Sequence, residues 1–195
     1  MRKNKEETNE TIDRLIDVAR VFFTKHGYAD SALEDIAAEA ELTRGALYHH
    51  FKNKKGLFHV VLERVQKEVA ERIESEAAKS EDVWEQLLLG CLAFVAAAVE
   101  PQNKRIMLVD GPAVLGWETW RTMDQHNSMR LLRGQLQIME KQGCLKQGSI
   151  EAMTHCLSGA LNELALWIAQ MPDFEQTLVD TRIIISNMLN GFKLS

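Results

Sequence analysis

The chain is short of residues that interrupt helices, since only three of its 195 residues are prolines, Pro101, Pro112 and Pro172. Each proline lies where an apolar pattern breaks, and no stretch sustains the apolar and polar alternation of a half-buried strand. Apolar residues instead recur at helical spacing along almost the whole chain. These observations predict an all-α protein.

Cysteine is also scarce. Cys91, Cys144 and Cys156 are an odd number at wide spacing, and they form neither a CxxC pair nor a zinc-type cluster with histidine. We therefore expect reduced and mostly buried thiols. A redox switch that uses two of them stays open as an alternative, because a sequence shows neither exposure nor thiolate character.

Long hydrophobic runs are missing too. The longest, residues 87–99, is too short to span a hydrocarbon core, and the basic first residues are not followed by the apolar stretch of a secretory signal. These features predict a cytoplasmic protein without a membrane anchor.

Patterns that carry chemistry are likewise missing. The sequence has no GxSxG, no Gly-rich phosphate loop and no Glu-x-x-His pair, and His126 and His155 stand alone. We expect no catalytic residue, no metal and no cofactor.

Positive charge gathers in one place although the formal net charge is -5. The stretch "ELTRGALYHHFKNKKGLF", residues 41–58, places Arg44, Lys52, Lys54 and Lys55 within twelve residues that contain no carboxylate. A solvated helix face normally carries both signs, so this pattern indicates a surface for an anionic partner.

The same stretch lies in a predicted helix-turn-helix. A first helix ends near Gly27, a second begins at Ser31 with Glu34 completing a capping box, and a third begins after Thr43 as its N-cap. Two short helices joined by a tight turn form the motif, and the first helix covers their apolar side.

The third helix has a cationic and aromatic face. Arg44, Tyr48 and Lys52 are spaced four residues apart, with Gly45 and His49 beside them. The face predicts a recognition helix for DNA.

The helix that follows begins with Lys54 and Lys55 in its first turn, where positive charge opposes the macrodipole. A phosphate docked there would resolve the conflict, because lysines and free backbone amides would converge on it. The pair therefore predicts a phosphate clamp.

The stretches "ARVFFTKHGY" and "SALEDIAAEAELTRGALYHHFKNKKGLF" resemble the DNA-binding domain of the tetracycline-repressor (TetR) family of bacterial regulators. The resemblance covers roughly the first quarter of the chain. It implies a homodimer that binds palindromic double-stranded operator DNA, with a carboxy-terminal domain that senses a small molecule. One departure is Glu41, which stands in the turn where the family commonly has glycine, and a non-glycine residue there is disfavoured at positive φ.

Carried over by position, the resemblance implies that Thr43 and Arg44 begin the recognition helix and that Tyr48, His49 and His50 approach bases and phosphates. It also implies backbone contacts from Lys54 and Ser31. The complete predicted DNA-binding set is Ser31, Thr43, Arg44, Gly45, Tyr48, His49, His50, Lys54 and Lys55.

We expect residues 1–52 to form the helix-turn-helix DNA-binding domain, and residues 53–195 to form a connector helix followed by a helical effector-binding and dimerisation domain. Further helices are predicted near residues 82–99, 104–109, 115–142, 149–171 and 174–190. The last two carry apolar residues on more than one side, so each must be covered twice, and this predicts a four-helix dimer interface.

Aromatic, methionine and polar residues between the connector and the last helices predict an effector pocket, although for any single residue a core position is the simpler interpretation. The predicted ligand-binding residues are Trp84, Cys91, Phe94, Met107, Trp117, Trp120, Met123, Asp124, Asn127, Asn162 and Glu163.

The sequence thus predicts a ligand-responsive DNA-binding transcriptional regulator, in the form of a repressor released from its operator by a small hydrophobic effector, and not an enzyme. Two alternatives stay open. The chain could be a helical-bundle enzyme or carrier with an incidental helix-turn-helix, or a regulator that senses oxidants through its thiols.

Overall fold

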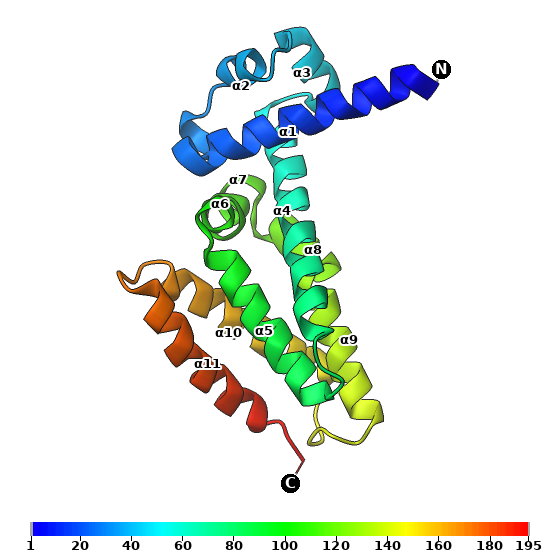
Figure 1. Ribbon diagram of the computed structural model, residues 1–195, viewed down its shortest axis with the longest axis vertical. Helices are drawn as coiled ribbons and strands as arrows, with labels where there is room; N and C mark the ends of the chain where they lie inside the picture. Colours follow the sequence, from blue (N-terminus) through cyan, green and yellow to red (C-terminus); the bar gives the residue numbers. More distant parts are fainter. Residues whose placement is uncertain (1, 195) are drawn as a thin grey trace. The chain divides into compact units, whose positions relative to one another are not determined.

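The computed structural model describes residues 2–194, with the backbone alone for residues 2–9, 174 and 175. Within this range the chain is helical, and its one isolated β-bridge joins Leu145 to Lys193 (Figure 1). The predicted all-α class is confirmed. The helices are α1 (Arg2–Asp30), α2 (Leu33–Glu39), α3 (Arg44–Phe51), α4 (Lys54–Ala77), α5 (Val83–Val99), α6 (Pro101–Lys104), a π-helix (Arg105–Asp110), α7 (Gly111–Leu115), α8 (Trp117–His126), α9 (Ser128–Lys141), α10 (Ile150–Ile168) and α11 (Phe174–Asn190).

The chain folds into two compact units. One contains residues 1–65 and 101–120, and the other contains residues 66–100 and 121–195. Helices α4 and α8 contribute residues to both units. The division into functional domains at residues 52 and 53 stays a prediction, since these units follow packing and not function.

The first unit is built on the apolar face of α1. Leu15 and Phe23 of α1 are fully buried, as are Leu47 of α3 and Phe58 of α4, and the rings of Phe23 and Phe58 meet edge to face with centroids 5.2 Å apart. Helices α2 and α3 have only seven and eight residues, and helices this short are marginal alone. Burial against α1 and α4 therefore holds the helix-turn-helix together.

Of the two predicted helix starts in this unit, the one at Thr43 is confirmed and the one at Ser31 is not. Thr43 is the N-cap of α3, and its Oγ1 accepts a hydrogen bond from the amide of Ala46 at 3.2 Å, as predicted. The predicted capping box at Ser31 is wrong, because the N-cap of α2 is Ala32, which makes no side-chain cap. The hydroxyl of Ser31 instead donates to the carbonyl of Gly27 at 2.6 Å, where positive φ kinks the end of α1.

The segment from Pro101 to Asp110 also packs on α1 in this unit. Arg20 donates to Asn103 Oδ1 at 2.9 Å, and the amide of Tyr28 donates to Asp110 Oδ2 at 3.0 Å. The second bond satisfies an amide beyond the Gly27 kink.

The second unit is centred on α5, which contacts α9, α10 and α11. The helices predicted near residues 82–99, 149–171 and 174–190 match α5, α10 and α11 closely. The single helix predicted over residues 115–142 is wrong, since Gly116 has φ 89° and the backbone breaks again at Asn127. The Asn127 side chain donates to the carbonyl of Met123 at 2.8 Å, and such local bonds compete with the helical ladder.

Two glycines in helices provide a test of this packing. A Cβ on Gly56, near the start of α4, would lie 2.2 Å from the backbone oxygen of Phe51, whereas a Cβ on Gly134 in α9 would meet nothing within 4 Å. Gly56→Ala should lower the free energy of unfolding by about 1 to 3 kcal/mol, because the backbone must shift. Gly134→Ala, the matched control, should raise it by up to about 1 kcal/mol. Urea unfolding at equal protein concentration measures both, and equal effects of the two variants would contradict the packing at Gly56.

Candidate nucleic-acid interface and ligand cavity

The predicted recognition helix α3 has one buried side and one open side. Leu47 and Phe51 are buried, while Thr43, Arg44, Tyr48 and His49 are exposed. The side chains predicted to meet DNA therefore project from a helix whose opposite face is fixed in the core.

Arg44 makes three contacts on this open side. Its Nη2 donates to the Tyr48 hydroxyl at 3.3 Å, and its Cζ lies 5.2 Å from the centroid of the Tyr48 ring. Its Nη1 lies 3.1 Å from Oε1 of Glu34, on α2. The hydrogen bond with Tyr48, followed by the charge of Glu34, raises the pKa of Arg44.

Gly45, His49 and His50 lie beside these residues. A Cβ on Gly45 would lie 3.9 Å from Thr43 Oγ1, at ordinary van der Waals distance, so packing inside the protein does not require a glycine there. The rings of His49 and His50 are 5.2 Å apart, with His49 exposed and His50 half-buried. The open backbone at Gly45 leaves room for close approach of a partner.

The three remaining predicted contacts differ in their surroundings. Ser31 is 1% exposed and bonded to Gly27, so a phosphate contact would require its hydroxyl to leave that bond. Lys54 donates to the carbonyl of Ala29 at 2.9 Å, and its ammonium lies 4.6 Å from the centroid of the Tyr28 ring. Lys55 is exposed. Lys54 thus ties α4 to the end of α1, whereas Lys55 has no such role among the contacts found.

The turn between α2 and α3 contains the residue that departs from the family pattern. Glu41 has φ 56°, in the left-handed region that glycine occupies without strain. Its carboxylate lies 3.6 Å from Arg14 of α1. The turn therefore holds a non-glycine residue at positive φ, and it places a carboxylate just before α3.

A cavity of about 290 Å³ lies wholly within the second unit. Residues from α4, α5, α9 and α10 and the start of the loop after α4 form its walls, and most of them are apolar. The lining residues are Ile73, Glu74, Ala77, Ala78, Gln86, Leu87, Gly90, Cys91, Phe94, Ser128, Met129, Leu131, Leu132, Gln135, Ser158 and Leu161.

Two of the predicted ligand-binding residues, Cys91 and Phe94, belong to this lining. Burial raises the pKa of the Cys91 thiol to about 12, so that thiol is neutral and a poor nucleophile. The predicted residues outside the lining are Trp84, Met107, Trp117, Trp120, Met123, Asp124, Asn127, Asn162 and Glu163. Which of these positions bind a ligand stays a prediction.

The predicted tryptophans have other surroundings. Trp120 is buried and its Nε1 donates to the carbonyl of Met107 at 2.8 Å, within the first unit. Trp117 is 64% exposed, with its ring centroid 5.0 Å from that of Trp120. The two tryptophans are close together in the sequence, but Trp120 lies in the core and Trp117 lies on the surface.

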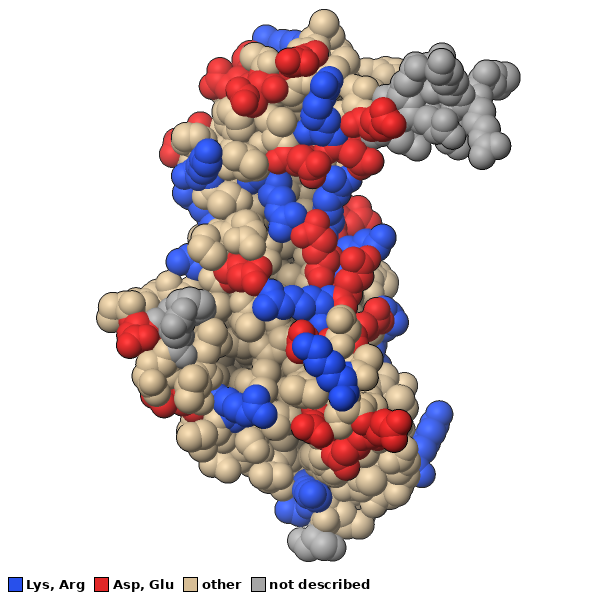
Figure 2. All heavy atoms as spheres, viewed as in Figure 1, with Lys and Arg blue, Asp and Glu red and all other residues tan. Residues whose placement is uncertain are grey.

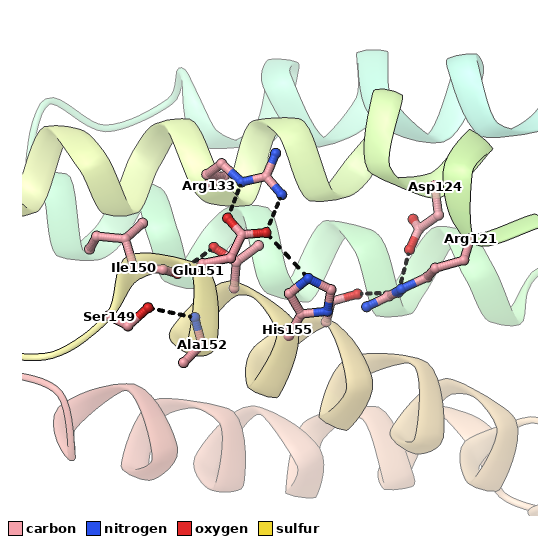
Figure 3. A network of polar contacts seen from close by, with 10 residues as sticks. Arg121, Asp124, Arg133, Ser149, Ile150, Glu151, Ala152 and His155 are labelled. Atoms are coloured by element: carbon pink, nitrogen blue, oxygen red, sulfur yellow. Dashed lines mark hydrogen bonds and ion pairs between the residues drawn. The ribbon is translucent and has the colours of Figure 1, made fainter. Parts of the chain in front are cut away.

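A buried ion pair lies next to the cavity wall. Arg121 Nη1 is 2.8 Å from Asp124 Oδ2 and donates to the hydroxyl of the lining residue Ser158 at 2.9 Å (Figure 3). Burial raises the pKa of Asp124 to about 6, against the opposing influence of Arg121 and Ser158. Sequence reasoning selected Asp124 but missed Arg121 and Ser158, whose approach depends on how α8 and α10 pack.

A second polar group joins α9 to α10. Arg133 donates to both carboxylate oxygens of Glu151 at 2.8 and 2.9 Å, and His155 Nε2 lies 3.3 Å from the same carboxylate (Figure 3). The bonds from Arg133 are the first cause of a lowered pKa of Glu151. His155, which looked isolated in the sequence, is part of this surface group.

In the part of the chain that the structure describes, no three His, Cys, Asp or Glu side chains gather in a way that could hold a metal ion. No single helix there is long and apolar enough to cross a membrane, and one bent pair around Glu100 reaches that length only when its two helices are joined.

Comparison with known proteins identifies the family. Residues 15–61 match the family described as "Bacterial regulatory proteins, tetR family", and residues 84–192 match "Tetracyclin repressor-like, C-terminal domain". A crystal structure of a TetR-family transcriptional regulator from Pectobacterium atrosepticum is 34% identical, with a TM-score of 0.81 over 97% of both chains. The chain belongs to the TetR family.

Curated TetR-family relatives are named as regulators or repressors. AcrR of Shigella flexneri is 32% identical over 55% of this chain, but the match spans only 50% of AcrR itself. TtgR of Pseudomonas putida is matched over 42% of its length, and BepR of Brucella suis is 28% identical over 94% of this chain and 93% of its own. These relatives favour a transcriptional regulator over the helical-bundle enzyme or carrier.

The buried Asp124 predicts a pH dependence. Its carboxyl has a pKa of about 6 in the folded protein against an ordinary value of 3.8, so between pH 4 and 6 the folded protein keeps a proton that the unfolded chain releases. The contribution of Asp124 to stability is therefore full below pH 4 and falls as pH rises to 6, by about 3 kcal/mol in total.

Urea unfolding of the wild type and Asp124→Asn at several pH values measures this contribution. The difference in free energy of unfolding between the two proteins should change in favour of the variant as pH rises through that window. A carboxyl carbon signal of Asp124 that titrates below pH 4.5 would contradict the assignment.

Proposed function

We propose that this TetR-family protein is a cytoplasmic repressor that binds palindromic operator DNA as a homodimer and releases it when a small hydrophobic molecule enters the cavity. The observation that carries the proposal is the open side of α3, where Arg44, Tyr48 and His49 project from a helix whose other side is buried. The chain as a whole is acidic, which favours DNA binding through this small face alone.

A second copy of the chain is the proposed partner of α10 and α11. Trp167, Val179, Ile183 and Ile184 are about half exposed on these helices, and an isolated protein rarely exposes so many large apolar residues together. Figure 2 shows the surface over α11 as mainly uncharged. An isologous pairing of these faces would remove that apolar surface from water and bring two recognition helices onto one DNA duplex.

The proposed effector is a neutral or cationic apolar compound that occupies the cavity of the second unit. Among the described residues that line it, Glu74 is the charged one, and the rest of its polar groups are amides and hydroxyls. Gln135 donates to Gln86 Oε1 at 3.0 Å, and each of the two side chains also donates to a backbone carbonyl. These amides can orient a ligand through hydrogen bonds, but they carry no charge. A volume of about 290 Å³ suits a compact ligand.

Effector and operator must be linked through two states of the dimer. A ligand with equal affinity for both states would bind and change nothing. If the effector weakens operator binding by a given factor, the operator weakens effector binding by the same factor.

Arg44 and Lys55 give the test of DNA binding. An operator is first selected from a random duplex library, and binding is then measured against salt concentration. Arg44→Ala should reduce discrimination at one base pair per half-site by about 1 to 3 kcal/mol, because a bidentate base contact is lost. Lys55→Ala should weaken all duplexes alike and lower the salt slope by about 1 per half-site, because a phosphate contact is lost.

Lys55 serves here in place of Lys54, because Lys54 also holds α4 to α1 and its loss would disturb the fold. The control is Lys67→Ala, which removes a lysine from α4 outside the helix-turn-helix. If no duplex in the library is preferred over random DNA, the proposed function is wrong.

The effector site is tested with one variant in the cavity and one outside it. Leu132→Trp adds volume to the lining and should abolish binding of hydrophobic compounds that quench tryptophan fluorescence in the wild type, whereas Trp117→Ala should leave their affinity unchanged. Bound compounds should weaken operator binding by about 5- to 150-fold. If Trp117→Ala abolished binding and Leu132→Trp left it unchanged, the effector would bind at the predicted tryptophans and not in the cavity.

A further inference from the structure

The helix-turn-helix carries as many acidic as basic residues, although a surface that attracts DNA by charge alone would have an excess of basic ones. Between residues 31 and 55 four acidic residues match four basic ones, so the motif is neutral when its histidines are neutral. The acidic residues are Glu34, Asp35, Glu39 and Glu41, and the basic residues are Arg44, Lys52, Lys54 and Lys55. Figure 2 shows both signs close together over α2 and α3. Such a surface attracts phosphates weakly, so affinity must come from specific contacts.

One of these carboxylates is fixed against the recognition helix. Oε1 of Glu34 lies 3.1 Å from Nη1 of Arg44, while Nη2 of the same guanidinium donates to Tyr48 at 3.3 Å. The side chains of Arg44 and Glu34 are 64% and 54% exposed. An ion pair this exposed adds little to the free energy of folding, so replacing Glu34 should leave the fold intact.

The geometry does explain a role in base recognition. A free arginine side chain samples many rotamers, and fixing the side chain in one of them on binding lowers the affinity. In the free protein Glu34 on one side and Tyr48 on the other contact the guanidinium, and these contacts favour this one rotamer before DNA binds. The guanidinium has five N–H donors, and these two contacts leave donors for the O6 and N7 acceptors of guanine.

We infer that Glu34 is a positioning residue that holds Arg44 for a guanine in each operator half-site and suppresses binding to other sequences. This inference rests on the proposed function, since it requires α3 to bind DNA. A phosphate would bring its negative charge close to Glu34 and be repelled, whereas the neutral edge of guanine would not. Glu34 therefore lowers the affinity for DNA of any sequence and raises the preference for guanine at one base pair.

Glu34→Gln and Asp35→Asn test the inference as a matched pair. Both remove one carboxylate from the first turn of α2, but only the first removes the group that contacts Arg44. Competition titrations against the selected operator, the operator with guanine changed to adenine at the Arg44 position, and a random duplex give the affinities.

Both variants should bind the random duplex more tightly than the wild type, because each loses a negative charge near the phosphates. Glu34→Gln alone should reduce the preference for guanine over adenine, by on the order of five- to tenfold. In an Arg44→Ala background Glu34→Gln should leave base preference unchanged, which a merely structural role of Glu34 would not produce.

Two results would overturn the inference while the proposed function stands. Glu34→Gln could keep the wild-type guanine preference, or Asp35→Asn could reduce it equally. If the wild type itself preferred no duplex, the proposed function would fail and the inference with it. Circular dichroism and urea unfolding of both variants should match the wild type, as an intact fold requires.

Discussion

The burial of the apolar face of α1 is the constraint on which the unit with the helix-turn-helix depends. Helices α2 and α3 are too short to be stable alone, and the fully buried Leu15, Phe23, Leu47 and Phe58 join them to α1 and α4. The open side of α3 can present cationic and aromatic groups because its other side is already fixed. Without that core, neither the Glu34 and Arg44 pair nor the turn at Glu41 would have a defined geometry.

The second unit is also held together by the burial of apolar helix faces. Helix α5 is covered by α9, α10 and α11, and the packing leaves a cavity with mostly apolar walls. Where polar groups lie near that cavity they are paired, as Arg121 is with Asp124 and Ser158. Buried charge is costly unless it is paired, so this group fixes how α8 meets α10.

Local sequence signals predicted the features that depend on local structure. The Thr43 cap, the end of α1 near Gly27 and the ranges of α5, α10 and α11 follow from capping residues and apolar spacing, and the structure agrees. Features that depend on tertiary contacts were missed or mistaken. The hydroxyl of Ser31 donates to a nearby carbonyl instead of capping α2, and the predicted helix over residues 115–142 breaks at Asn127. The walls of the cavity come mainly from four helices, whose mutual packing no spacing in the sequence reveals.

The proposed function requires two copies of α3 to bind one operator together. Hydroxyl-radical footprinting of the selected operator tests it most directly, because it shows which sugars the protein covers. We expect two protected patches on one face of the duplex, about 10 base pairs apart, that appear together as protein is added. A single patch, or two patches that fill independently, would contradict it.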